Sequence, residues 1–300
     1  MNSLSIKLSK LYDEKIVLFL GIVAASLVIW GLDLFSFAKF ALDNESYNYV
    51  GLIPLVSGYF LWLSRNRFTG NNGNSAWGYP LIFTGVIVSL LSFIITCKDP
   101  VSTFSIKTTG TVLVSFGAFV MCWGWRGFKD VLFPMLFLVF AIPLSQDALN
   151  NVVIFLQHGS AVMVDWLFTL LGQTYIRNGV EFHLNSISIS IAPECSGIRS
   201  TTALVVTCAV AVEMLLRNYW LKLSMFLLII PFSLLKNAIR IVTITMLAEY
   251  VDTAFLTDSF LHHSGGIFFY LIVLAIYFPL LLVLAKSEKK RSAAPKSVTK

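Results

Sequence analysis

The sequence predicts an all-α membrane protein that crosses the bilayer several times. Of its 300 residues, 57% are hydrophobic and 13% are charged, whereas about a quarter of the residues in soluble domains are charged. Its mean hydropathy is +0.79. The apolar residues gather in stretches close to the length that a spanning helix needs, about 20 residues. A soluble enzyme is therefore excluded.

Eight apolar stretches are candidate spanning helices, and they cover residues 16–38, 49–64, 79–97, 111–125, 131–145, 201–216, 219–249 and 265–285. The seventh is longer than one span requires, and Pro231 is expected to kink it. Between the fifth and sixth lies the segment 146–172, which mixes polar and apolar residues. We expect it to form an amphipathic helix on the outer surface of the membrane. The alternative, a ninth span there, would move the following residues to the cytoplasm.

The basic residues predict the orientation. They fall in short clusters beside apolar stretches, namely Lys7, Lys10 and Lys15, Arg65 and Arg67, Arg126 and Lys129, Arg217 and Lys222, and the tail from Lys286. Eight spans with a cytoplasmic N-terminus place all of these clusters inside, as the distribution of Lys and Arg in membrane proteins requires. The net charge of +6 is thus assigned to topology and contact with lipid, not to nucleic acid. The tail, residues 286–300, is expected to be disordered and cytoplasmic.

After residue 172 the pattern changes to a period of two, in TYIRNGVEFHL and NSISISIAP. Alternating apolar and polar residues with an Asn178-Gly179 pair are typical of strands joined by a tight turn. We expect a small β-element here. It ends at Pro193, Glu194 and Cys195, which places the cysteine at a strand-to-helix junction near the outer face.

Cys195 differs from the other three cysteines. Cys97, Cys122 and Cys208 lie inside or at the end of apolar stretches, where cysteine usually behaves as a small hydrophobic residue. Cys195 precedes a predicted helix, and the positive end of a helix dipole favours a thiolate. No CxxC pair or Cys/His cluster has zinc-binding spacing, so we expect neither a metal nor a cofactor.

Two further groups of residues suggest chemistry. Asn237 and Arg240 are three residues apart in LLKNAIRIV and share one face of a helix, and a charge within an apolar stretch normally faces a polar interior. Lys236 beside them is interpreted as a cation at the membrane interface. His262 and His263 precede the last span on the same side as Cys195. A thiol, an imidazole and a guanidinium together favour acyl transfer.

These motifs resemble the exosortase and archaeosortase family of membrane cysteine transpeptidases. ECSGIRS, KNAIRIV and HHSGG occur in the family's order, and FPMLFLVFAIPLS resembles the stretch that precedes its catalytic domain. The resemblance implies N-terminal helices over 1–130 and a catalytic membrane domain over 131–285. It implies Cys195 as the nucleophile, Arg240 as the essential arginine and His262, or alternatively His263, as the third member. The supporting or substrate-binding residues that it implies are Glu194, Ser196, Gly197, Arg199 and Asn237.

The resemblance also implies the substrate. Targets are secreted proteins with a C-terminal sorting signal, which consists of a short motif, one transmembrane helix and a basic tail. Cleavage through a thioester is expected at the outer face of the bacterial inner membrane. Two alternatives stay open: a non-catalytic assembly factor for envelope polysaccharide export, and a transporter lined by the polar residues. The recognition motif, the acceptor and the oligomeric state are not predicted.

Overall fold

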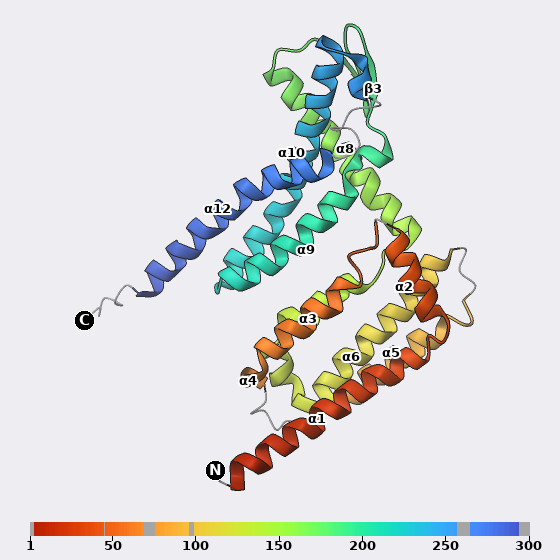
Figure 1. Cartoon of the computed structure of the whole chain (residues 1–300), viewed down its shortest axis with the longest axis vertical. Coiled ribbons are helices and arrows are strands. Elements are labelled where there is room, and N and C mark those ends of the chain that lie inside the picture. The colour runs from red at the N-terminus through yellow and green to blue at the C-terminus, as the bar shows by residue number, and fades with distance from the viewer. Residues whose placement is uncertain (1–2, 45, 69–75, 96–98, 257–264, 294–300) are drawn as a thin grey trace. The chain divides into compact units, whose positions relative to one another are not determined.

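A computed structural model describes residues 3–44, 46–68, 76–95, 99–256 and 265–293. The chain divides into two units, Met1–Leu149 and Asn150–Lys300. Figure 1 shows that both are built from helices and that the strands belong to the second. The predicted helical membrane protein with a small β-element is thereby confirmed in outline.

The first unit is arranged around α6. Its elements are α1 (Ser3–Val28), α2 (Asp33–Asp43), α3 (Leu52–Leu63), α4 (Arg65–Phe68), α5 (Gly78–Leu91), α6 (Pro100–Asp130), α7 (Leu132–Phe137) and the 3₁₀ turn η1 (Leu138–Ala141). Glycines let α5 and α6 pack backbone to backbone, since a Cβ on Gly110 would lie 2.5 Å from the Gly85 carbonyl oxygen. An aromatic cluster that includes Phe119 and Trp123 fills the core beside them.

The helix α6 begins well before the expected span at residue 111. Asp99 caps it by accepting from the Ser102 N–H at 2.5 Å, and Pro100 occupies its first turn, where proline fits best. Lys107 does not break the helix, because it is buried and forms an ion pair with Asp33 of α2. The cap at Asp99 and the ion pair of Lys107 therefore extend α6 through residues 100–110, which the hydropathy pattern did not include in the expected span.

Fewer helices than eight are long and apolar enough to cross a membrane. Within the described residues five qualify, and six if the pair 14–28 and 33–43, bent by 88°, is one span. The expected spans over 49–64, 79–97 and 131–145 are instead shorter apolar helices, Leu52–Leu63, Gly78–Leu91 and Leu132–Ala141. Hydropathy measures how apolar a stretch is, but the length of its helix depends on where turns begin and end it. In these three stretches the helix is shorter than the apolar stretch.

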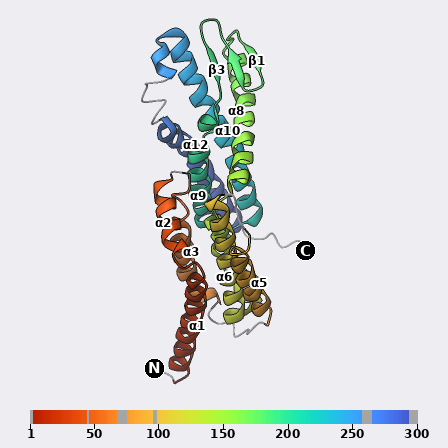
Figure 2. The ribbon, with the colours of Figure 1, turned by 90° about the vertical axis from the view of Figure 1, so that its right-hand side faces the viewer.

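The second unit contains all of the strands among the described residues. Its elements are α8 (Gln146–Leu170, which starts in the first unit), β1 (Ile176–Asn178), β2 (Glu181–His183), β3 (Ser188–Ser190), the 3₁₀ turn η2 (Pro193–Ser196), α9 (Ile198–Leu215), α10 (Tyr219–Tyr250), the 3₁₀ turn η3 (Thr253–Leu256) and α12 (Gly265–Ala293). Both views show the sheet beside α8 and the last turns of α10 (Figures 1 and 2).

This unit has two apolar cores. One joins α9, α10 and α12 around Cys208, Met225, Ile229 and Tyr277, and we call it the bundle core. The other joins α8, the sheet and α10 around Phe168, Phe182, Ile191 and Val242, and we call it the cap core. The helix α10 belongs to both. It runs unbroken through Pro231 for 32 residues, about 48 Å, which is longer than the hydrocarbon layer of roughly 30 Å.

The segment expected to lie on the membrane surface forms α8, whose 25 residues and mean hydropathy of 1.4 are those of a membrane span. Four of its polar residues, Asp147, Asn150, Asn151 and His158, are exposed, whereas two others bind neighbouring elements. Gln157 donates to the Ile191 carbonyl, and Asp165 accepts from the Tyr175 hydroxyl at 2.7 Å and pairs with Arg177 at 3.2 Å. These two side chains bind the sheet, so part of the polar pattern reflects contacts within the unit, and the interfacial position of α8 stays a prediction.

The β-element follows the predicted pattern. The strands form an antiparallel sheet in the order β1-β2-β3, with Phe182 opposite Ile189. Gly179 adopts a φ of +63° in the turn between β1 and β2, as an Asn-Gly pair favours. At the other end of the chain, α12 continues through residues 286–293, which we expected to be disordered. Its Lys, Glu and Arg residues there are good helix formers.

Candidate active site

Cys195 lies in a turn between the sheet and α9. The chain leaves β3, enters η2 and donates the Cys195 N–H to the Ala192 carbonyl at 2.9 Å. Gly197 then takes a φ of +76° and α9 begins at Ile198. The cysteine is half-buried beside the cap core. Its predicted strand-to-helix setting is thus present, with two residues between the thiol and the first helical residue.

Asn237 of α10 holds this turn in place. Its Nδ2 donates to the Cys195 carbonyl at 2.8 Å and to Ser160 Oγ of α8 at 3.0 Å. Its Oδ1 lies against Gly197, since a Cβ on that glycine would be 2.8 Å from it. Gly197 is therefore required both for its left-handed backbone and for the close approach of Asn237. The two motifs that the sequence analysis selected are in direct contact.

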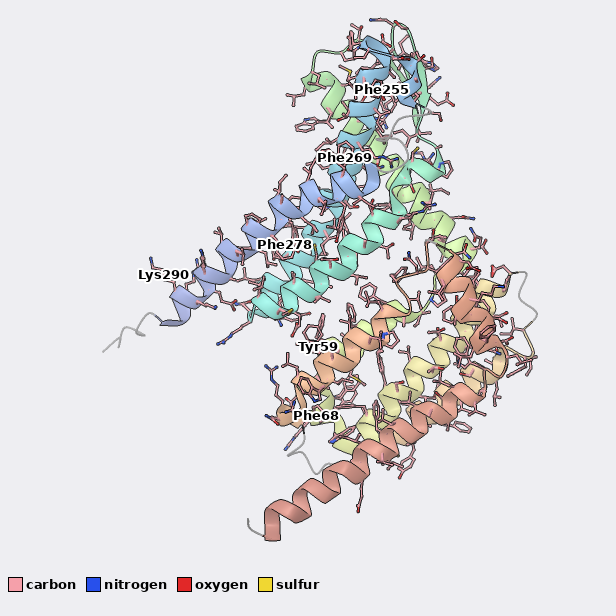
Figure 3. The ribbon with its side chains drawn as sticks, viewed as in Figure 1. Tyr59, Phe68, Phe255, Phe269, Phe278 and Lys290 are labelled. Atoms are coloured by element: carbon pink, nitrogen blue, oxygen red, sulfur yellow. The ribbon has the colours of Figure 1, made fainter. Side chains whose placement is uncertain are left out.

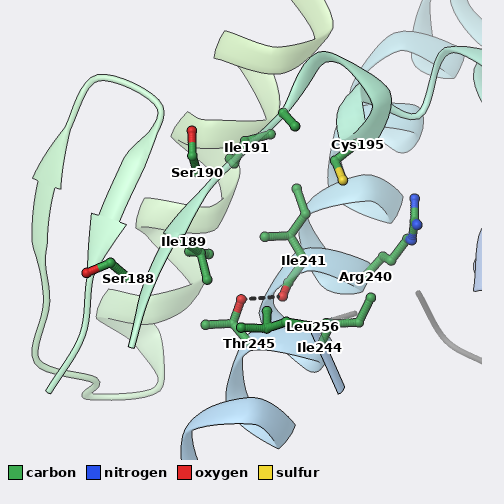
Figure 4. Close-up of a pocket in the computed structure, with 11 residues that line it drawn as sticks. Ser188, Ile189, Ser190, Ile191, Cys195, Arg240, Ile241, Ile244, Thr245 and Leu256 are labelled. Atoms are coloured by element: carbon green, nitrogen blue, oxygen red, sulfur yellow. Dashed lines mark hydrogen bonds between the residues drawn. The ribbon is translucent and has the colours of Figure 1, made fainter. Parts of the chain in front are cut away.

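Arg240 follows Asn237 by one helical turn and lines a pocket with Cys195. The pocket has a volume of about 270 Å³ and is formed by Ser188, Ile189, Ser190, Ile191, Ala192, Cys195, Arg240, Ile241, Ile244, Thr245 and Leu256. Figure 4 shows the thiol and the guanidinium on the same side of it. The structure thus brings together a thiol and a guanidinium that lie 45 positions apart in the chain.

A second basic residue lies one turn before Arg240 on α10. Lys236 is 2% exposed and donates to Ser200 Oγ of α9, while Thr201 and Ser233 share a hydrogen bond nearby. The interpretation of Lys236 as an interfacial cation is wrong. A lysine near the end of an apolar stretch normally extends toward water, but here a hydroxyl on the neighbouring helix binds it inside the protein.

The remaining candidates are less completely defined. Ser196 is buried, and its hydroxyl has no hydrogen-bond partner among the described residues. Arg199 is exposed on the first turn of α9. Glu194 belongs to η2. His262 and His263 lie outside the described residues. Of the other histidines, His183 contacts Ser188 at 2.8 Å across the sheet and His158 is exposed.

Sequence reasoning missed the residues that position the site. Ser160, Gln157 and Ser200 are single polar residues on otherwise mixed helices, and no spacing rule distinguishes them from surface residues. The part of the chain that the structure describes contains no group of three His, Cys, Asp or Glu side chains that could bind a metal.

Comparison with known proteins identifies the family. The sequence model of the transmembrane exosortases matches residues 41–279, a range that includes Cys195, Asn237 and Arg240. No curated protein and no solved structure is significantly similar to the chain. Because the match covers well over half of the sequence and the motif residues meet in one site, this membrane protein belongs to the transmembrane exosortase family.

Proposed function

We propose that this protein is a membrane cysteine protease and transpeptidase that cleaves the C-terminal sorting signals of secreted proteins through a thioester. The observation that carries the proposal is that Cys195 and Arg240 line one pocket. Both residues belong to the motifs on which the family resemblance rests. Because they share one pocket, a thiol and a guanidinium could act on the same substrate.

The chemistry is an acyl transfer. The Cys195 thiolate attacks the scissile carbonyl carbon, a C–S bond forms, and the carbonyl oxygen becomes an oxyanion. When the tetrahedral intermediate collapses, the C–N bond breaks and the amine leaves with a proton. His262, or His263, is the proposed carrier of that proton. Water or an acceptor amine then attacks the thioester and releases Cys195.

Arg240 supplies positive charge to this reaction. A guanidinium beside a half-buried thiol favours the thiolate over the thiol. The same charge stabilises the oxyanion that develops during attack, and this effect is strongest where the protein excludes water. A cation in the same pocket as the thiol fits a nucleophile better than an inert cysteine.

The distribution of basic residues supports an active site on the outer face. Glu288 of α12 accepts from the backbone N–H groups of Arg217, at 3.0 Å, and Asn218, at 2.5 Å. The turn between α9 and α10 therefore lies beside the end of α12. The basic residues that gather there are Arg217, Lys222, Lys286, Lys289, Lys290 and Arg291, with Lys290 labelled in Figure 3. Such a cluster marks the cytoplasmic side.

Cys195 lies at the other end of α9 from this cluster. The 18 residues of α9 span about 27 Å, close to the thickness of the hydrocarbon layer. A cytoplasmic cluster at one end thus supports a position of the cysteine near the opposite, periplasmic surface. This argument uses only the second unit and does not depend on the total number of spans.

The test of the function is processing of a reporter. A secreted domain is fused to a C-terminal sorting signal encoded in the same genome and expressed with the enzyme. We expect Cys195→Ala and Cys195→Ser to abolish cleavage and Cys208→Ala, in the bundle core, to retain it. Cleavage that persists in both Cys195 variants would contradict the mechanism and favour a non-catalytic assembly role.

Orientation has its own measurement. A membrane-impermeant maleimide applied to intact spheroplasts is expected to modify Cys195, as mass spectrometry of the modified peptide reveals. Modification only after lysis would place the site in the cytoplasm and exclude cleavage of secreted proteins.

A further inference from the structure

The strand β3 borders the pocket along one edge of the sheet. Its other edge pairs with β2, and no other described strand pairs with it. Five consecutive residues, 188–192, line the same pocket as Cys195 and Arg240. Figure 4 shows the open side of β3 facing α10 and the two motif residues. An unpaired strand edge thus leads along the pocket to the proposed nucleophile.

The ladder shows which backbone groups face the open edge. Ile191 N–H donates to the Val180 carbonyl at 3.1 Å, and Leu184 N–H donates to the Ile187 carbonyl at 2.8 Å. Because the direction of backbone groups alternates along an antiparallel strand, residues 187, 189 and 191 turn their groups toward β2. Ser188 and Ser190 therefore turn their N–H and C=O groups toward the pocket.

The edge is also held firmly in place. Gln157 of α8 donates to the Ile191 carbonyl at the end of β3, and Glu249 of α10 accepts from the Ser186 N–H at 3.1 Å just before it. On the inner face, Phe182 and Ile191 are buried in the cap core. A strand fixed at both ends and along one face is a rigid surface for a partner of complementary shape.

We propose that β3 binds the substrate by strand addition. The extended segment immediately N-terminal to the cleaved bond would pair with Ser188 and Ser190 as a fourth strand. This inference rests on the proposed function and specifies how its substrate is held. An unpaired edge presents the hydrogen-bonding groups that an extended peptide completes, and a peptide held extended exposes its carbonyl to the thiol.

The added strand would be parallel to β3. The strand β3 runs toward Cys195 and then into α9. The substrate chain likewise runs from its secreted domain toward its own transmembrane helix, with the cleaved bond between them. Ile189, Ile241 and Ile244 line the floor of the path for substrate side chains.

The first experiment removes one edge donor. Ser190→Pro lacks the outward N–H but keeps the hydrogen bonds to β2, because residue 190 does not donate to that strand. Its reference is Ser190→Ala, which also lacks the hydroxyl. With the reporter described above, we expect the proline variant to be processed at least about fivefold more slowly than the alanine variant, as loss of one hydrogen bond implies. Equal rates in the two variants would contradict strand addition.

A second experiment detects the pairing without catalysis. Ser188→Cys is combined with Cys195→Ala, and single cysteines are placed along the reporter before its cleavage site. Residues opposite each other on adjacent strands are close enough for a disulfide after mild oxidation. Ile176→Cys on β1 is the matched control, because it lies on the opposite edge of the same sheet. We expect cross-links at alternate reporter positions with Ser188→Cys alone.

The outcomes separate this inference from the function on which it rests. A wild-type enzyme that does not cleave the reporter contradicts the function. Normal cleavage, together with cross-linking from Ser188→Cys that does not exceed that from Ile176→Cys, contradicts strand addition alone. The rate at which a small maleimide modifies Cys195 reports whether Ser190→Pro retains the native site. If Ser190→Pro does not retain the native site, the cross-linking result alone tests strand addition.

Discussion

The contact between Gly197 and Asn237 can be tested quantitatively. An alanine at position 197 would have to adopt the left-handed conformation, at about 1–2 kcal/mol. Its methyl group would also lie 2.8 Å from Asn237 Oδ1, which is too close for a carbon–oxygen contact, so the side chain of Asn237 would move. Its hydrogen bonds to the Cys195 carbonyl and to Ser160 would be lost.

The magnitudes follow from these contacts. Two hydrogen bonds contribute about 2 kcal/mol together, so Gly197→Ala is expected to lower the free energy of unfolding by roughly 3–4 kcal/mol. Asn237→Ala loses the same two bonds, about 2 kcal/mol. In the double variant the bonds are lost only once and the clash is gone, so its destabilisation is again about 3–4 kcal/mol and not the additive 5–6.

The assay is denaturant unfolding of the detergent-purified protein, followed by tryptophan fluorescence, for the wild type, both single variants and the double variant. The expected coupling energy between the two positions is about 2 kcal/mol. Additive effects, with a coupling energy near zero, would refute the argument that the glycine exists to admit Asn237.

Two further predictions concern charge and packing. Arg240→Ala is expected to slow the modification of Cys195 by a small maleimide about tenfold or more, since a nearby cation favours the thiolate. The control Lys222→Ala removes a cation that pairs with Glu213 at the far end of α10, and it is expected to leave this rate unchanged. Equal slowing by both variants would show that only the net charge of the protein matters. Gly110→Ala introduces a Cβ 2.0 Å from Ser89 Oγ, while a Cβ on Gly58 meets nothing within 4 Å. We therefore expect a clear loss of thermal stability, by about 1–3 kcal/mol, in the first variant only, and equal melting temperatures for Gly110→Ala and Gly58→Ala would contradict the close packing of α5 on α6.

The parts of the fold and of the candidate site that could be predicted are those encoded by a local sequence pattern. Period-two alternation and the Asn178-Gly179 pair located the sheet, because a strand that is half-buried alternates its side chains and the turn requires a positive φ. The motif spacing selected Gly197, Asn237 and Arg240, which proved to touch the cysteine turn or to share its pocket.

The rest depended on contacts between distant residues, which hydropathy does not encode. Lys107 and Lys236 are buried only because Asp33 and Ser200 happen to face them. Two polar residues of α8, Gln157 and Asp165, bind the Ile191 carbonyl and Arg177 at the sheet, and their spacing in the sequence did not reveal these contacts. The proposed catalytic histidines, 262 and 263, lie outside the described residues and stay predictions from the motif.

The continuity of α10 has a consequence for the evolution of the site. Met225 and Ile229 pack in the bundle core and so fix the rotation of α10 about its own axis. That rotation sets the direction in which Arg240 points, some three to four turns further along the helix. Each residue of a helix advances by about 100° and 1.5 Å. Inserting one residue between Ile229 and Asn237 would thus turn Asn237, Arg240 and Val242 together relative to the bundle core, so that the two cores could not both keep their contacts. Substitutions in this helix can accumulate, but insertions and deletions cannot.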